Sequence, residues 1–153
     1  MADIGERLEA SLARHLGGEQ FVTAIIAEIH ESEITLVNFG HPAPLLILDD
    51  GTLHPADPPD PGLPLGLGAL EPAAVKAHRV PFGSGDRILF FTDGVIEARD
   101  KGGEFYPLEE RVWLLRRDDP QAGLDALRAD LVQHTGGPLL DDAAMLLLHR
   151  PGD

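Results

Sequence analysis

A short apolar run that ends in an aspartate at a sharp turn constrains this chain more than any other feature. Residues 87–92 (RILFFT) lead directly into Asp93 and Gly94, and Asp-Gly is a pair that favours turns. Farther along, the pair Asp141-Asp142 stands directly before the apolar run 143–148. Both runs have the length and composition of buried strands. Carboxylates held at the ends of two such strands supply the fixed oxygen ligands that hard metal ions prefer.

Structural explanations compete with this interpretation. An Asp-Gly pair taken alone is more often a turn than a ligand. The chain has three Asp-Asp pairs, and those at residues 49–50 and 118–119 are expected in a hairpin turn and at a helix cap. The pair at residues 141–142 abuts a continuous apolar run, where adjacent like charges are costly unless a cation or hydrogen-bond donors compensate them. For the pair at residues 141–142, a structural role and a role as metal ligand are both open alternatives.

Composition narrows the function classes. With 153 residues, 43% of them hydrophobic, the chain is expected to form a single domain over residues 1–153. A net charge of -14 argues against nucleic acid as a partner, because phosphate binding requires Lys and Arg. The absence of cysteine excludes disulfides and thiol catalysis. No apolar run reaches membrane-spanning length and the first residues do not resemble a signal peptide, so we expect a soluble cytoplasmic protein without membrane contact.

The order of apolar periods and turn signals predicts a layered α/β (α+β) architecture with a largely antiparallel sheet. A proline-rich stretch at residues 54–64 is expected to form a surface loop, because proline disrupts helices and central strands. The expected helices cover residues 2–16, 108–117 and 121–133, and the expected strands cover residues 21–29, 34–39, 45–48, 75–80, 87–92 and 143–149.

Histidine chemistry is a weaker candidate. The seven histidines show no spacing typical of a zinc site. His41 precedes Pro42, and we expect a turn residue whose ring bonds to the backbone; a catalytic base is the alternative.

Five segments, taken in order, form a recognisable set. They are residues 21–24 (FVTA), 37–44 (VNFGHPAP), 63–67 (LPLGL), 85–98 (GDRILFFTDGVIEA) and 141–144 (DDAA). With Phe39 in place of the usual small residue and Ala144 in place of Thr, the set resembles the PP2C-type (PPM) serine/threonine phosphatases of the bacterial SpoIIE/RsbU-like branch. The resemblance extends from about residue 20 to residue 149.

The resemblance implies a fold, a cofactor and a set of roles. The fold would be an αββα sandwich of two antiparallel sheets, with two Mg²⁺ or Mn²⁺ ions in a cleft. A water shared by both ions would attack the phosphorus of phosphoserine or phosphothreonine. Asp93 and Asp141 would be catalytic metal ligands, and Asp142 the neighbour of Asp141 or its alternative. Gly94 would let the backbone turn tightly beside the metal.

The family's earlier motif Asp-Val-x-Gly-x-Gly, whose aspartate bridges the two metals, is not found in this chain; Asp3-Ile4-Gly5 is one residue short in spacing. We therefore expect the C-terminal portion of such a domain, incomplete at its N-terminal side. Two carboxylates can hold one Mg²⁺ weakly, so weak metal binding and poor turnover are expected. Uncovered sheet edges would favour self-association.

Three functions follow from these observations. The first is a metal-dependent phosphoprotein phosphatase, whose substrate by resemblance is a phosphoserine on a STAS-type anti-anti-sigma protein in a partner-switching pathway. The second is a non-catalytic binding or regulatory module, favoured by the missing motif. The third, an acidic globular domain with structural Asp turns, is disfavoured by the ordered set of motifs.

Overall fold

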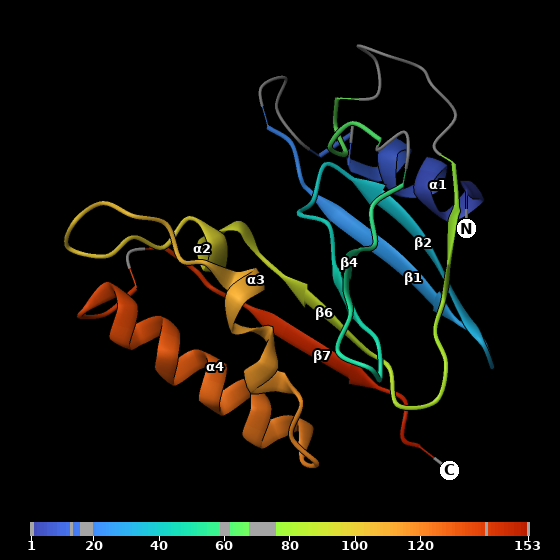
Figure 1. Cartoon of the computed structure of the whole chain (residues 1–153). Coiled ribbons are helices and arrows are strands. Elements are labelled where there is room, and N and C mark those ends of the chain that lie inside the picture. The colour runs from blue at the N-terminus through green and yellow to red at the C-terminus, as the bar shows by residue number, and fades with distance from the viewer. Residues whose placement is uncertain are drawn as a thin grey trace. The chain divides into compact units, whose positions relative to one another are not determined.

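The computed structural model describes residues 2–12, 14–15, 20–58, 62–67, 76–139 and 141–152. These residues form two compact units, which we call the first unit (Met1–Ala43 with Ala56–Gly83) and the second unit (Pro44–Pro55 with Ser84–Asp153). Figure 1 labels their elements. The expectation of one domain over residues 1–153 stays a prediction.

The second unit is built on a four-stranded antiparallel sheet in the order β4-β3-β6-β7. Its central strand β6 is buried because its residues are almost all apolar. In the register of the sheet, Leu89 of β6 stands opposite Leu45 on one side and Leu147 on the other. The strands are β3 (Leu45–Ile47), β4 (Leu53–Pro55), β6 (Arg87–Phe91) and β7 (Met145–His149).

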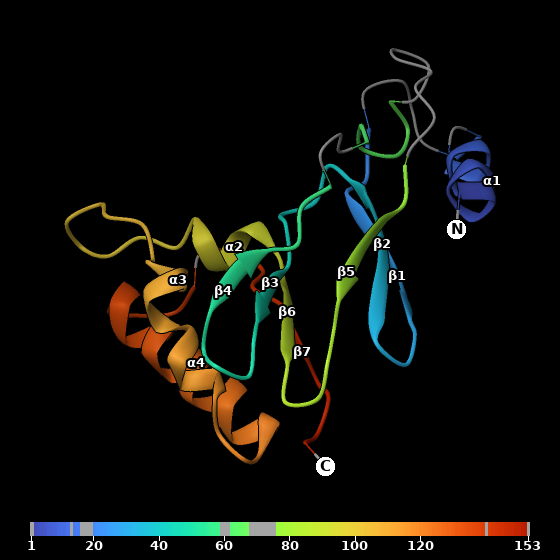
Figure 2. The same ribbon diagram turned by 45° about the vertical axis from the view of Figure 1, so that its right-hand side comes forward.

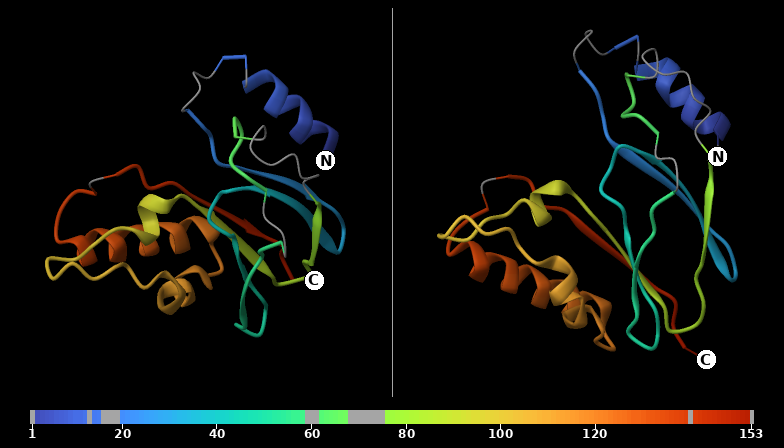
Figure 3. Two further views of the ribbon diagram at one scale, coloured as in Figure 1. Left: turned by 90° about the horizontal axis from the view of Figure 1, so that it is seen from above. Right: turned by 45° about the horizontal axis from the view of Figure 1, so that its top comes forward.

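Helices cover this sheet and close its core. The long helix α4 runs beside β7 (Figures 1 and 3) and buries Leu127 and Leu131 completely in one apolar cluster with Leu89. Its glycine at position 123 lies against the backbone of Leu115, where a Cβ would be 3.1 Å from the Leu115 Cα. The helices are α2 (Asp93–Ile96), α3 (Leu108–Arg111), the 3₁₀ helix η1 (Val112–Leu115) and α4 (Pro120–Thr135).

The first unit contains the helix α1 (Ala2–Leu12) and a three-stranded antiparallel sheet, shown in Figure 2. Its small core contains Val37 and Phe39, and Leu12 of α1 packs against it. The sheet order is β1-β2-β5, with β1 (Ala24–Ile29), β2 (Glu33–Phe39) and β5 (His78–Pro81).

The predicted mixture of helices and largely antiparallel sheets is confirmed, with differences at element boundaries. The helix expected over residues 2–16 ends at Leu12, and residues 13 and 16–19 lie outside the described part of the chain. The helix expected over residues 108–117 consists of α3 followed by η1. The strand expected over residues 75–80 begins at His78, and residue 75 is not described.

The expectation of a surface loop over residues 54–64 is wrong at its first two positions. Residues 54 and 55 belong to β4, which pairs with β3 across the hairpin predicted around Gly51. Pro55 is tolerated because β4 is the outer strand of its sheet, where a missing N–H group breaks no ladder. Residues 59–61 lie outside the described residues.

None of the helices in the described residues combines the length and apolarity needed to cross a bilayer.

The cap of α4 offers a test of this fold. Asp119 accepts a hydrogen bond from the Gln121 amide at 3.0 Å, as expected for a helix N-cap. We expect Asp119→Ala to lower the free energy of unfolding by about 1 kcal/mol. Chemical denaturation measures the change, with Asp118→Ala as the matched control at the exposed neighbouring position. Equal losses in both variants would contradict the role of the cap.

Candidate metal centre

The predicted ligands lie at one end of the β6–β7 pair. Because the strands are antiparallel, with Phe91 opposite Met145, the end of β6 meets the start of β7. Thr92 keeps an extended backbone, and Asp93 then begins α2 and accepts a hydrogen bond from the Gly94 amide at 3.0 Å. The Asp-Gly turn and the segment of Asp141 are therefore neighbours.

Thr92 joins the two segments directly. Its hydroxyl donates to the Asp142 carbonyl at 3.0 Å and accepts from the Ala144 amide at 2.9 Å. Its own amide donates to the Ala144 carbonyl at 3.1 Å. A Cβ at Gly94 would lie 2.6 Å from the Asp142 carbonyl oxygen. The turn can approach the Asp-Asp pair this closely because position 94 has no side chain.

The carboxylates of the site are exposed. Asp93, Asp141 and Asp142 all reach solvent, and Asp141 accepts a hydrogen bond from the Asp142 amide at 2.7 Å. Within the described part of the chain, no three or more His, Asp or Glu side chains are grouped as metal ligands. Asp93 and Asp141 are exposed carboxylates on adjoining segments, and one or two carboxylates are enough to hold one hydrated divalent ion.

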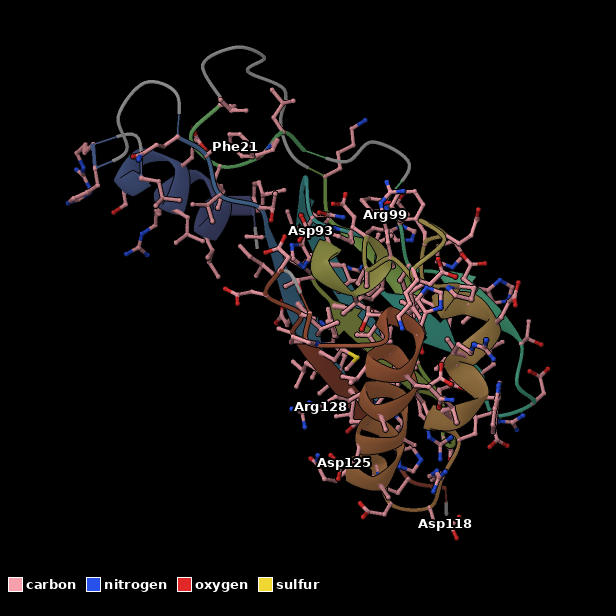
Figure 4. All side chains as sticks on the ribbon, turned by 90° about the vertical axis from the view of Figure 1, so that its left-hand side faces the viewer. Phe21, Asp93, Arg99, Asp118, Asp125 and Arg128 are labelled. Carbon is pink, nitrogen blue, oxygen red and sulfur yellow. The ribbon has the colours of Figure 1, made fainter. Side chains whose placement is uncertain are left out.

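A cleft of about 470 Å³ adjoins these residues. Gly94 and Asp141 line it, together with residues from segments 97–101 and 135–139. Figure 4 shows Asp93 and Arg99 toward one end of the second unit, and Asp118, just before the cap of α4, toward the other. The cleft thus shares residues with the predicted metal site, although sequence reasoning did not identify its other walls.

One wall of the cleft is a tight hairpin over residues 98–106. Arg99 bridges to Phe105 in antiparallel fashion, and the Tyr106 amide donates to the Ala98 carbonyl at 2.8 Å. The Asp100 carboxylate accepts from the amides of Glu104 at 2.9 Å and Gly102 at 2.8 Å. Hydrogen bonding, first from Glu104, holds the pKa of Asp100 below its ordinary value.

The hairpin is anchored on α4. The buried Tyr106 hydroxyl donates to Asp130 at 2.8 Å, and Arg111 lies 3.5 Å from the same carboxylate oxygen. Burial, together with this bond, raises the pKa of Tyr106. A ring nitrogen of His134 lies 3.1 Å from the Glu104 carbonyl. Tyr106 is the chain's one tyrosine, but its sequence position carries no signal for a partner on α4.

His41 belongs to a turn in the first unit. Its amide donates to the Asn38 side chain at 2.8 Å, and Asn38 donates back to the His41 carbonyl at 2.8 Å. The predicted turn is confirmed. The predicted ring contact with the backbone is wrong: the ring nitrogen Nδ1 lies 3.0 Å from the Thr23 hydroxyl, because the turn brings that side chain alongside.

Known proteins match both the sequence and the fold. The sequence model of the family described as Stage II sporulation protein E (SpoIIE) matches residues 1–151. No curated protein sequence matches the chain. The solved RsbU and RsbW domains of a Mycobacterium tuberculosis protein are similar, with 27% identity and a TM-score of 0.71 over 99% of this chain and 42% of that one.

Two manganese-associated structures share the fold. The phosphatase domain of SpoIIE from Bacillus subtilis, presoaked with manganese, has a TM-score of 0.69 at 16% identity over 97% of this chain and 65% of that one. The catalytic domain of the serine/threonine phosphatase PstP with two manganese ions has a TM-score of 0.67 at 16% identity, over 97% and 67%. The chain thus spans 65% and 42% of the lengths of the SpoIIE and RsbU–RsbW structures.

The contact between Gly94 and the Asp-Asp pair predicts a specific sensitivity. In Gly94→Ala the new methyl group would overlap the Asp142 carbonyl, so we expect a loss of about 1–3 kcal/mol in the free energy of unfolding and weaker Mn²⁺ binding. Denaturation and calorimetric titration measure the two effects. Gly137→Ala is the control, since among the described residues nothing lies within 4 Å of a Cβ there. Unchanged stability in Gly94→Ala would contradict the close approach.

The hairpin's dependence on Asp100 predicts a pH effect. The folded state lowers the pKa of the Asp100 carboxyl group. The charged carboxylate therefore stabilises the hairpin at pH values above its pKa in the unfolded chain. This contribution is lost as the pH falls through its pKa in the folded chain. Amide NMR signals of Gly102 and Glu104 should therefore shift with a midpoint below about 4, the usual aspartate value. Asp100→Ala should abolish that dependence; a midpoint at or above the usual value would contradict it.

Proposed function

The chain belongs to the SpoIIE family, and from this premise we propose that it is a metal-dependent phosphatase of phosphoserine or phosphothreonine in proteins. The observation that carries the proposal is the backbone contact between the Asp93-Gly94 turn and the Asp141-Asp142 pair. This contact brings together the carboxylate-bearing segments that hard cations require. Family membership and the PP2C-like fold support the reaction class.

Each residue of the site has a proposed role. Asp93 and Asp141 hold Mn²⁺ or Mg²⁺ through their exposed carboxylates, and Asp142 is their neighbour or a further ligand. Thr92 and Gly94 keep the two segments at a constant spacing. The ion, when bound, supplies the Lewis acidity that phosphate ester hydrolysis needs. Manganese in the related structures supports this choice of metal.

We propose that the substrate is a phosphoserine on a STAS-type anti-anti-sigma protein. The resemblance to the SpoIIE/RsbU-like branch and the match to a structure of RsbU and RsbW domains support this substrate. A role in signal transduction and a cytoplasmic location belong to the same proposal and rest on the family resemblance.

We further propose that the isolated chain turns over slowly and self-associates. Slow turnover is supported by the number of proposed ligands, because two carboxylates suit a single hydrated ion. A single ion polarises one oxygen of the reacting groups, whereas two ions would share and activate the attacking water. Self-association is supported by β1, an outer strand of its sheet with Ile29 54% exposed.

A non-catalytic binding module is the second candidate function. It is favoured by one observation: the described residues contain no cluster of three metal-binding side chains. Such a module would keep the fold and the cleft and would bind a partner without hydrolysis.

Hydrolysis of p-nitrophenyl phosphate with and without Mn²⁺ separates the two functions. For the phosphatase, we expect manganese-dependent turnover that falls by about 10- to 100-fold or more in Asp93→Asn and in Asp141→Asn, because each loses a charged ligand. Asp118→Asn, at the other end of the second unit, is the control and should keep its turnover. Absence of turnover in a folded wild-type chain that still binds a phosphoprotein would favour the binding module.

A further inference from the structure

We propose that Lys101 selects protein substrates by pairing with an acidic side chain next to the phosphorylated residue, and that the cleft beside Asp141 receives this flanking segment. The inference rests on the proposed function, because it names the substrate class of the same site. Its occupant is an acidic stretch of a phosphoprotein.

The position of the cleft determines what can enter it. Gly94 and Asp141 belong both to the cleft and to the predicted metal site. A phosphorylated side chain that reaches Asp93 and Asp141 therefore carries its neighbouring residues into the cleft. A volume of about 470 Å³ accommodates small ligands or a few side chains, and Pro138 and Leu139 provide apolar wall.

Most charged groups of the cleft are already engaged. Asp100 accepts two amide hydrogen bonds from its own hairpin. Arg99 donates to the Gly103 carbonyl at 2.8 Å, and its guanidinium lies 3.8 Å from the centre of the Phe105 ring. In contrast, no hydrogen bond or ion pair with the described residues involves the Lys101 ammonium group. Lys101 is thus a cation of the cleft that makes no such interaction with the described residues, whereas Arg99 is partly engaged.

The cleft also contains carboxylates. Asp141 is assigned to the metal, and Glu97 lies at the end of α2, whose first turn carries Asp93. A divalent ion at the site would offset the charges of Asp93 and Asp141, and the remaining charged residues of the lining then sum to zero; they are Glu97, Arg99, Asp100 and Lys101. Elsewhere the chain repels anions, since its formal charge is -14. An acidic segment is therefore repelled less at this cleft than at the surface at large, and Lys101 offers it a partner.

The stem of Lys101 lies against Gly136. A Cβ at Gly136 would lie 2.9 Å from Lys101 Cε, so the missing side chain at the end of α4 leaves room for the stem. The hairpin that carries Lys101 is anchored by the bond from Tyr106 to Asp130. A positioned cation loses less side-chain entropy on pairing than a freely rotating one.

Two fluorescein-labelled peptides test the inference. They share a central phosphoserine and differ at the flanking residues, which are Glu in one and Lys in the other. Fluorescence anisotropy with Mn²⁺, and again without it, measures binding to the wild-type chain, Lys101→Glu and Lys101→Gln. Lys76→Glu is the matched control: it makes the same charge change at the chain's other lysine, in the first unit.

We expect the wild-type chain to prefer the Glu-flanked peptide by about two- to fivefold, the range of one exposed ion pair. Lys101→Gln should remove this preference and Lys101→Glu should reverse it, while Lys76→Glu should keep it. The preference should shrink at high salt. An unchanged preference in Lys101→Glu, confirmed as folded by circular dichroism, would overturn the inference, as would equal loss in Lys76→Glu.

The outcome is separable from that of the proposed function. If p-nitrophenyl phosphate is hydrolysed but neither peptide is preferred, the phosphatase stands and the selection by Lys101 is wrong. If nothing is hydrolysed but the Glu-flanked peptide is preferred through Lys101, the cleft binds acidic phosphoprotein segments and the catalytic proposal is wrong.

Discussion

The antiparallel pairing of β6 with β7, continued past the strand ends by Thr92, is the interaction on which the candidate site depends. Thr92 and Asp142 are 50 residues apart in the sequence, yet the hydroxyl of one bonds to the carbonyl of the other. The amide and the hydroxyl of Thr92 together make three hydrogen bonds to backbone groups of the second segment. The segments that carry Asp93 and Asp141 are therefore joined by contacts that continue the sheet.

The helix α4 provides the second support. Its buried leucines attach it to the sheet, and Asp130 on its partly exposed side holds Tyr106 of the hairpin. At and after the end of α4, Thr135, Pro138 and Leu139 also line the cleft. One helix thus positions both the hairpin and the approach to the aspartate pair, so a change in its packing would move both together.

Local patterns explain which parts could be predicted. The apolar run of β6 and the Asp-Gly turn after it could be predicted from their own residues, because burial patterns and turn preferences depend on a few neighbouring residues. The strand β4 was missed because Pro55 argues against a strand unless the strand is known to lie at an edge. The bond from Tyr106 to Asp130 and the position of Lys101 over Gly136 were also missed, since they depend on packing between distant segments.

Charge connects the metal with the substrate. A chain with a formal charge of -14 attracts divalent cations but repels phosphorylated, acidic proteins. The exposed carboxylates of Asp93 and Asp141 suit divalent cations and not phosphorylated proteins. A bound ion would offset the charges of Asp93 and Asp141, and Lys101 would place a positive charge on the wall of the same cleft. Metal binding would then both activate the ester and admit the substrate, so the two steps would share one electrostatic cause.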